Sequence, residues 1–326
     1  MQTILDSFRN KGYLLDSSVY QYLLKEKVDK ILVACSGGAD SLFALLLLMS
    51  HQKEMGVDLE VAHFNHNWRG VDSAKDALYV EDFAKKLKLH FWFDSANEDQ
   101  STKSETNARV ARIKFLRKTA KESGASVIAF GHQMDDILET QIQRLGRGSN
   151  IEGLIAPRPV HLFENEPTHI RPILSFRAEE IKEILTKHDL AWCVDASNND
   201  ERIVRNKLRN SIIPQLAECM ERDVSKGSCR SRKLLEEHAN FLNELAKERL
   251  PACYNLEAKL DRLLLRSEKQ SLTRRAFFYW LHKMIPNFPA SARLQEQLLN
   301  AIYGEQFREK FSLGEVFIVM NKRQIW

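Results

Sequence analysis

Closely spaced cysteines are missing from this sequence. Its five cysteines stand far apart among 326 residues, and no two of them form a C-x-x-C motif. The odd number and wide spacing argue against a disulfide framework, a zinc ribbon and an iron–sulfur cluster. Long apolar runs are missing too, because the longest, Leu42 to Met49, is far below the ~20 residues that span a bilayer. The N-terminus shows no basic–apolar–small signal pattern, so we expect a cytoplasmic protein with no membrane partner.

Acidic residues are slightly fewer than basic ones, and the net charge of +4 is unevenly distributed. Residues 216–326 contain 19 basic and 14 acidic side chains, whereas residues 1–215 contain 29 basic and 30 acidic ones. The basic excess is densest from Arg202 to Lys233. Such a stretch is either a solvated helix face or a contact for a polyanion, and the charge alone does not decide between them.

Repeats and low-complexity tracts are also lacking, and the length favours two domains. In the first part, strand patterns (30–35, 59–64, 90–93 and 126–130) alternate with helix patterns (40–51, 73–87, 105–123 and 135–147). This alternation predicts an α/β fold, a doubly wound and mostly parallel sheet covered by helices. After a further expected helix at 177–187 and beyond Pro214, the pattern becomes mainly helical, with only 315–320 strand-like. We expect one domain over 1–216 and a smaller, mainly helical one over 217–326.

One hexapeptide joins the first expected strand to the first expected helix. Its residues are Ser36, Gly37, Gly38, Ala39, Asp40 and Ser41. Consecutive backbone N–H groups at the positive end of the helix dipole form an anion-binding nest, which the two glycines let a phosphate approach closely. The loop lacks the lysine of the Walker type of phosphate loop, and its Asp40 suits a magnesium ion bridging phosphates. The alternative is a glycine turn that only connects strand to helix.

A second polar motif, Gly131 to Thr140, follows the fourth expected strand. If the first and fourth strands are neighbours, both motifs face one crevice at the carboxyl ends of the strands. On the helix that opens there, Asp136, Glu139 and Thr140 share one face. Helix capping and dipole compensation would explain one of the carboxylates, but not His132, Asp136 and Glu139 together beside a phosphate nest.

Other histidines and arginines are ambiguous when taken alone. His63, Asn65 and His66 end the second strand without the cysteine or acidic partners of a metal site, so purine contacts are expected. His63 could equally be a satisfied strand-end residue. Arg109 and Arg112 are neighbours on a helix face and either form salt bridges in solvent or face phosphate. The same two readings apply to Arg171, Arg177, Arg205 and Arg209.

Six motifs follow one another in the order S-G-G-A-D-S, H-F-N-H-x-x-R-G, E-T-N-A-R-V-A-R, G-H-Q-M-D-D-I-L-E-T, R-P-I-L-x-x-R and R-N-K-L-R-N-x-I-I-P. Together they resemble the PP-loop ATP pyrophosphatases and, within them, the tRNA(Ile)-lysidine synthases. The resemblance covers about residues 28–216 and is weak beyond them. The sequence departs from the pattern at Ala196, where proline is common in relatives, and this is expected to alter loop stiffness rather than chemistry.

The resemblance implies a ligase that uses ATP with Mg²⁺. Carbon 2 of the wobble cytosine of a CAU-anticodon tRNA(Ile) would be activated by AMP transfer with release of pyrophosphate. Free lysine would then attack through its ε-amine and release AMP. The same resemblance leaves the oligomeric state open, a homodimer being one candidate.

The resemblance also implies roles for individual residues. ATP would be bound by the Ser36–Ser41 loop, His63 and Asn65, with Asp40 and Asp136 as metal carboxylates. Asp136, Glu139 and His132 would select and deprotonate lysine, and which carboxylate does which task is left open. Arg109 and Arg112 would face the adenylate or tRNA phosphate. The expected tRNA contacts are Arg177, Arg205, Asn206 and Arg209, and the basic domain over 217–326 would extend this contact, mainly by attraction to phosphates.

Two rival functions would share part of these motifs. A PP-loop tRNA cytidine thiolase would usually bring paired cysteines, and none stand near the motifs. A module that senses ATP without turning it over would need the phosphate nest but neither the Asp136–Glu139 face nor the arginine-rich segment.

Overall fold

A computed structural model describes the chain except for residues 68–70, 97–104, 195–201, 254–258, 286–291, 307 and 314–315. The departure at Ala196 lies outside the described residues. The backbone forms two compact units: the first comprises 1–140 and 156–229, and the second comprises 141–155 and 230–326. The division into domains at residue 216 stays a prediction. Among the described residues, no helix combines the length and apolarity needed to cross a membrane.

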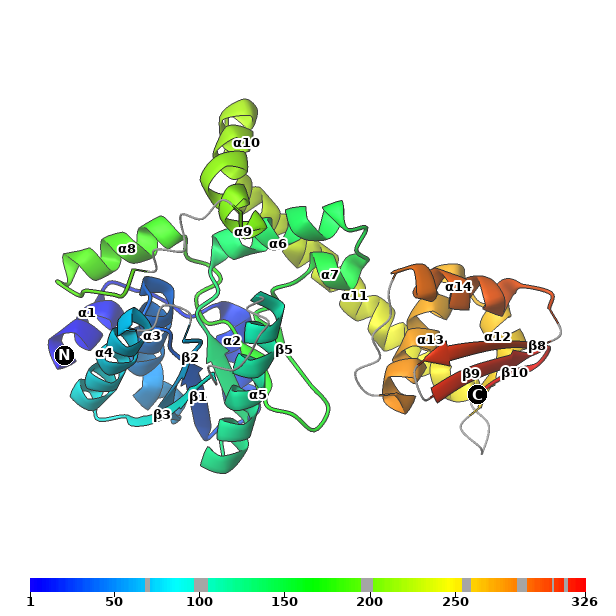
Figure 1. Cartoon of the computed structure of the whole chain (residues 1–326), viewed down its shortest axis with the longest axis horizontal. Helices are drawn as coiled ribbons and strands as arrows, with labels where there is room; N and C mark the ends of the chain where they lie inside the picture. The colour runs from blue at the N-terminus through cyan, green and yellow to red at the C-terminus, as the bar shows by residue number, and fades with distance from the viewer. Residues whose placement is uncertain are drawn as a thin grey trace. The chain divides into compact units, whose positions relative to one another are not determined.

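The first unit is built on a six-stranded sheet in the order β3-β2-β1-β4-β6-β5 (Figure 1). Its strands are β1 (Lys30–Ala34), β2 (Asp58–Asn65), β3 (His90–Ser95), β4 (Val127–Phe130), β5 (Val160–His161) and β6 (Thr168–Ile170). All neighbouring pairs are parallel except β5 with β6. The predicted mostly parallel sheet is therefore confirmed.

Helices cover both faces of this sheet because successive strand residues point to opposite sides. Ile31 and Val33 of β1 belong to a core that includes much of α3 (Ala39–Met55), whereas Leu32 packs with Phe115 and Leu116 of α5 (Glu105–Ser123). The apolar residues of β1 after Lys30, and those throughout β4, follow from this two-sided burial. The first unit's other helices are α1 (Gln2–Asn10), α2 (Ser17–Lys25), α4 (Val71–Leu87), α8 (Ala178–Lys187), α9 (Val204–Lys207) and α10 (Ile213–Met220).

Three helical segments matter for the arrangement of charges described below. A π-helical turn, η2 (Leu208–Ile212), connects α9 to α10. Helix α6 (Met134–Gly146) and helix α11 (Val224–Cys253) each begin in the first unit and continue into the second.

The second unit combines helices with a four-stranded sheet in the order β7-β10-β9-β8. Its elements are α7 (Ile151–Leu154), β7 (Leu260–Asp261), α12 (Arg262–Ser267), α13 (Gln270–Met284), α14 (Ala292–Tyr303), β8 (Arg308–Leu313), β9 (Val316–Asn321) and β10 (Gln324–Ile325). The sequence indicated strand structure only at 315–320, so this expectation was too narrow. Two of the other strands have only two residues each, which is too short for a period-2 pattern.

A buried arginine stabilises the end of α14 in this unit. The Arg262 guanidinium donates to the carbonyl oxygens of Ile302 (3.0 Å), Gly304 (2.7 Å) and Asn321 (2.6 Å). These carbonyls belong to the end of a helix and the end of a strand, where backbone acceptors lack partners of their own. Burial lowers the pKa of Arg262.

Candidate active site

Strands β1 and β4 are adjacent and parallel, with Ala34 opposite Phe130. The loops that follow them therefore meet at one edge of the sheet, as the sequence predicts if these strands are neighbours. Their backbones touch, because a Cβ added to Gly131 would lie 2.8 Å from the Ser41 backbone nitrogen. Only glycine permits this approach without a shift of the backbone.

The loop after β1 is held by its own hydroxyl groups. Ser41 Oγ donates to the Gly38 carbonyl (2.9 Å) and accepts from the Ser36 backbone N–H (3.1 Å). Gly37 has φ +87°, a left-handed conformation that favours glycine. Helix α3 then starts at Ala39 with no side-chain cap, so the amide groups of its first turn are arranged to receive an anion.

A segment that the sequence analysis did not single out packs on this loop. The Cys193 backbone N–H donates to the Gly37 carbonyl (2.9 Å), and a Cβ at Gly37 would lie 3.0 Å from Cys193 Sγ. The two residues are far apart in sequence, and no local pattern marks Cys193 as a wall of the site.

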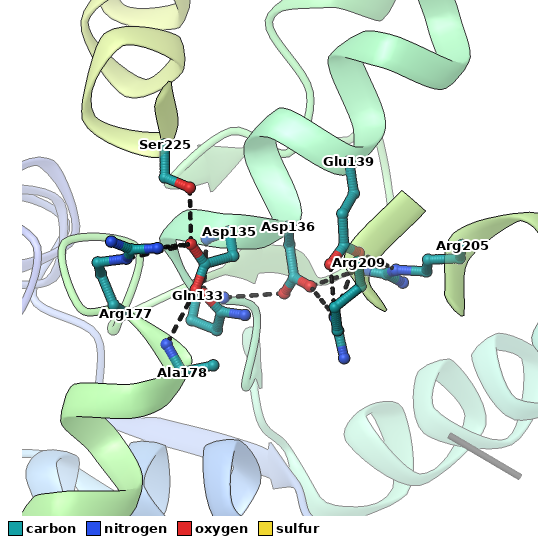
Figure 2. A network of polar contacts seen from close by, with 9 residues as sticks. All are labelled: Gln133, Asp135, Asp136, Glu139, Arg177, Ala178, Arg205, Arg209 and Ser225. Carbon is teal, nitrogen blue, oxygen red and sulfur yellow. Dashed lines mark hydrogen bonds and ion pairs between the residues drawn. The ribbon is translucent and has the colours of Figure 1, made fainter. Parts of the chain in front are cut away.

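The carboxylates of Asp136 and Glu139 are buried side by side on α6 and are paired with two arginines (Figure 2). Arg205 donates through Nε to Glu139 Oε2 (2.6 Å) and through Nη2 to Asp136 Oδ1 (2.5 Å). Arg209 donates through Nε to Glu139 Oε1 (2.6 Å) and through Nη2 to Glu139 Oε2 (3.1 Å) and Asp136 Oδ1 (3.2 Å). The expected acidic site and half of the expected tRNA-binding set thus form one charge cluster.

The fourth oxygen of this carboxylate pair is used as well. Asp136 Oδ2 accepts from the Gln133 backbone N–H (2.9 Å). Every oxygen of Asp136 and Glu139 therefore has at least one donor in the described structure, and another cation that binds to Glu139 or to Asp136 Oδ1 competes with a guanidinium group.

Asp135, next to Asp136, points into a separate network on the other side of the helix start (Figure 2). Its carboxylate accepts from the Arg177 side chain (3.2 and 3.3 Å), the Ala178 backbone N–H (3.1 Å) and Ser225 Oγ (2.7 Å). Arg177 also pairs with Asp223 (3.2 Å). Asp135 thus joins the starts of α6, α8 and α11, and Arg177, expected at tRNA, belongs to this joint.

Comparison with known proteins identifies the family. Residues 14–216 match the PP-loop domain. The chain is 31% identical over 274 residues to the tRNA(Ile)-lysidine synthase of Caldanaerobacter subterraneus, covering 80% of this chain and 58% of that protein. It is 30% identical over 277 residues to the tRNA(Ile)-lysidine synthase of a Synechococcus species, covering 84% of each. The chain belongs to the PP-loop family, in its tRNA(Ile)-lysidine synthase branch.

The relatives differ in length. The tRNA(Ile)-lysidine synthase of Clostridium perfringens is 33% identical over 228 residues, which are 68% of this PP-loop chain but 48% of that protein. The chain thus spans about half of the length of several curated relatives.

Asp40, the aspartate of the PP-loop, is a weaker acid than an ordinary aspartate. Burial, followed by the negative charge of Asp136, raises the pKa of Asp40 to about 7. The two carboxylates are therefore close enough to repel each other, and a divalent cation would relieve that repulsion. Mg²⁺ commonly uses one or two carboxylates together with substrate phosphates, so Asp40 and Asp136 fit such an ion. The described residues contain no group of three or more potential metal ligands.

The charge cluster fixes the protonation of its arginines. Burial opposes the charged form, but attraction to Asp136 and Glu139 outweighs burial and raises the pKa of Arg205 above its ordinary value. Hydrogen bonding to Glu139 likewise raises the pKa of Arg209 against the effect of burial. Both guanidinium groups stay charged.

Burial and several nearby arginines lower the pKa of His132. Burial, followed by the charges of Arg171 and Arg205, lowers the pKa of His132 well below its ordinary value. Its Nδ1 is buried and has no hydrogen-bond partner in the part of the chain that the structure describes. His132 is therefore neutral, and the surrounding arginines make it a weak base.

Arg112 lies in the same electropositive region. Its Nε is buried and has no partner among the described residues, and burial, Arg109 and Arg205 lower the pKa of its guanidinium. An unpaired buried donor among like charges is suited to an anion. Arg109 lies one helical turn earlier and is exposed, and Asn206 lies on α9 between the two arginines of the charge cluster.

His63 and Asn65 at the end of β2 have local partners. His63 Nδ1 lies 2.9 Å from the Cys35 carbonyl, which fixes that nitrogen as the donor, and its ring stacks on Phe93. Asn65 Oδ1 accepts from the Asn67 backbone N–H (2.7 Å). These contacts fit the reading of His63 as a satisfied strand-end residue, and the purine contact stays a prediction.

Proposed function

We propose that this PP-loop protein joins lysine to carbon 2 of the wobble cytidine of the CAU-anticodon tRNA(Ile). ATP would supply AMP to the cytidine, pyrophosphate would leave, and lysine would then displace AMP. One observation carries the proposal. The buried carboxylates of Asp136 and Glu139, which already bind two cationic side chains, lie on the helix that follows Gly131, and Gly131 contacts the backbone of the Ser36–Ser41 loop. The names of the relatives support tRNA(Ile) as the acceptor.

In the first half-reaction, the nest at Ser36–Ser41 and the first turn of α3 would hold ATP phosphate oxygens. Arg112, which has a buried unpaired Nε among the described residues, would bind a phosphate of the adenylate, with Arg109 beside it. Asp40 and Asp136 would hold Mg²⁺, which neutralises charge on the departing pyrophosphate. His63 and Asn65 would border the nucleotide.

In the second half-reaction, the free amino acid is cationic and must lose a proton before it attacks. A lysine ε-amine with pKa ~10.4 is neutral in only about one molecule in 2,500 at pH 7. Asp136 and Glu139 would bind the ammonium group, as they bind guanidinium groups in the structure. One of these two carboxylates would accept the proton. Neutral His132, whose lowered pKa makes it a weak base, would accept a hydrogen bond.

Binding of lysine in this way requires an exchange of partners. Arg205 and Arg209 would leave the carboxylates for the tRNA backbone, whose phosphates offer the bidentate geometry that guanidinium prefers. Asn206 lies between them and would follow, whereas Arg177 would reach tRNA only from its joint with Asp135. The acidic pocket would thus become available when tRNA is bound.

The test measures pyrophosphate release and incorporation of labelled lysine with purified protein. We expect ATP to yield AMP and pyrophosphate only with a CAU-anticodon tRNA, and the label to enter that tRNA. Retention of labelled sulfur would indicate the thiolase, and ADP with phosphate would contradict AMP transfer. Sedimentation of the same sample tests the homodimer, which stays a prediction.

A further inference from the structure

The antiparallel sheet of the second unit has one buried and one exposed face. Ile318, Met320 and Ile325 point into the core and are at most 1% exposed. The residues that alternate with them point outward, and Phe317 and Trp326 are 47% and 37% exposed. Two large aromatic rings therefore lie on the solvent side of the same sheet.

Basic side chains share this exposed face. Arg308 and Lys310 of β8 pair in register with Asn321 and Val319 of β9, so they point outward with Phe317. Lys310 Nζ lies 3.6 Å from the centre of the Phe317 ring. Lys259 Nζ lies 5.8 Å from the centre of the Trp326 ring, so each aromatic ring on this face has an ammonium group above it.

Among the residues that the structure describes, no acidic side chain of the four strands neutralises the positive charge of this face. Glu309 pairs in register with the buried Met320 and points to the core side. The Asp261 carboxylate accepts the backbone N–H groups of Leu263 (2.8 Å) and Leu264 (3.0 Å) and caps α12. The outward surface thus combines exposed rings with the basic side chains of Arg308 and Lys310.

We propose that this sheet face binds unpaired nucleotides of an RNA. Phe317 and Trp326 stack on bases, and Arg308 and Lys310 neutralise phosphates. Such a combination of π-faces and cations recognises single-stranded nucleic acid without base-specific hydrogen bonds. A base replaces the lysine above each ring, and the released ammonium group meets the adjoining phosphate. The inference rests on the proposed action on tRNA and adds to it the surface and the type of contact.

The experiment compares Phe317→Leu and Trp326→Leu with the natural chain by fluorescence anisotropy. Leucine keeps an apolar side chain but offers no ring for stacking. The probes are a labelled CAU-anticodon tRNA transcript and a labelled uridine decamer. We expect each variant to bind both probes about tenfold more weakly. Lys310→Gln should lower the slope of log affinity against log salt by about 0.7, the value of one phosphate contact on a single strand.

Tyr279 provides a matched control in the same unit. It is 41% exposed on α13 and has Lys247 Nζ 5.7 Å from the centre of its ring, but it lies outside the sheet. Tyr279→Leu should change RNA binding by less than twofold. An equal loss in this variant would overturn the proposal, because any exposed ring would then serve.

The remaining outcomes separate this proposal from the proposed function. Normal RNA binding by both Phe317→Leu and Trp326→Leu, with melting temperatures near that of the natural chain, refutes the sheet face even if lysine enters tRNA. If the two variants bind RNA more weakly but the natural chain incorporates no lysine into tRNA, the sheet face is supported and the proposed ligase activity is refuted. Tighter binding to phosphatidylserine vesicles than to either RNA, lost in the same variants, identifies a membrane surface and also overturns the proposal.

Discussion

Replacing Arg209 with glutamine removes one of the two guanidinium groups that neutralise Asp136 and Glu139. Three hydrogen bonds disappear, at 2.6, 3.1 and 3.2 Å. Breaking a fully buried ion pair costs about 3–5 kcal/mol. The side chain of Arg209 is 40% exposed whereas that of Glu139 is 1% exposed, and Arg205 remains, so we discount the loss to about 2 kcal/mol.

The same substitution should improve binding of lysine in the absence of tRNA. In the natural chain the lysine ammonium must displace a guanidinium group, and this competition disappears in the variant. If half or more of the ~2 kcal/mol is returned when lysine binds, affinity rises about fivefold to thirtyfold, since 1.4 kcal/mol is tenfold. Calorimetric titration with L-lysine measures the affinity, and urea unfolding measures the stability.

Two variants serve as controls for Arg209→Gln. Arg209→Lys keeps a competing cation, so lysine affinity should stay within about threefold of the natural value. Arg177→Gln weakens the Asp135 joint without touching the carboxylate pair, and should lower stability but leave lysine affinity unchanged. Weaker lysine binding by Arg209→Gln would refute the reasoning, because the arginine would then support lysine binding and not compete with it.

Three further predictions concern the site and the stability of each unit. Asp136→Asn should bind tRNA normally in a filter assay yet release no pyrophosphate, and normal turnover would displace the metal assignment. Arg262→Met leaves buried carbonyls without donors and should cost about 3 kcal/mol in urea unfolding, against less than about 0.5 for the exposed Arg266→Met. Burial, followed by the charges of Arg171 and Arg117, lowers the pKa of His169 to about 3 in the folded chain. As the pH falls from 7.5 to 5.5, His169 therefore becomes protonated only in the unfolded chain, where its pKa is ~6.5. Stability should therefore drop by about 1.4 kcal/mol between pH 7.5 and 5.5 on this account, and His169→Gln should remove that part of the slope.

Many strands and helices of the first unit could be predicted because the sequence patterns that mark them are local. Apolar runs bounded by glycine and polar residues mark β1, β2 and β4, and the expected helix at 105–123 matches α5 (Glu105–Ser123). The short strands of the second unit could not be predicted in the same way. The two residues of β7 pair only with the two residues of β10, which lie about sixty positions further along the chain, and neither segment carries a pattern of its own.

The candidate site shows the same division. The sequence predicts that the loops after β1 and β4 meet if these two strands are neighbours, because parallel strands end at the same edge of the sheet, and the structure supplies that adjacency. The sequence does not predict that Arg205 and Arg209 reach back across more than sixty residues to Asp136 and Glu139. Nor does it separate Asp135 from Asp136, although one joins three helices and the other faces the charge cluster.

The sequence by itself determined the PP-loop, the mostly parallel α/β class of the first unit and the family. These follow from backbone geometry and short-range patterning, which a few residues specify. The tertiary structure alone decided which charges are paired, that Cys193 packs on Gly37, and that Phe317 lies on an exposed sheet face. A long flexible side chain can reach many partners, so its sequence position does not specify one. Burial selects the partner, because leaving a buried charge unpaired costs more free energy than ordering the side chain does.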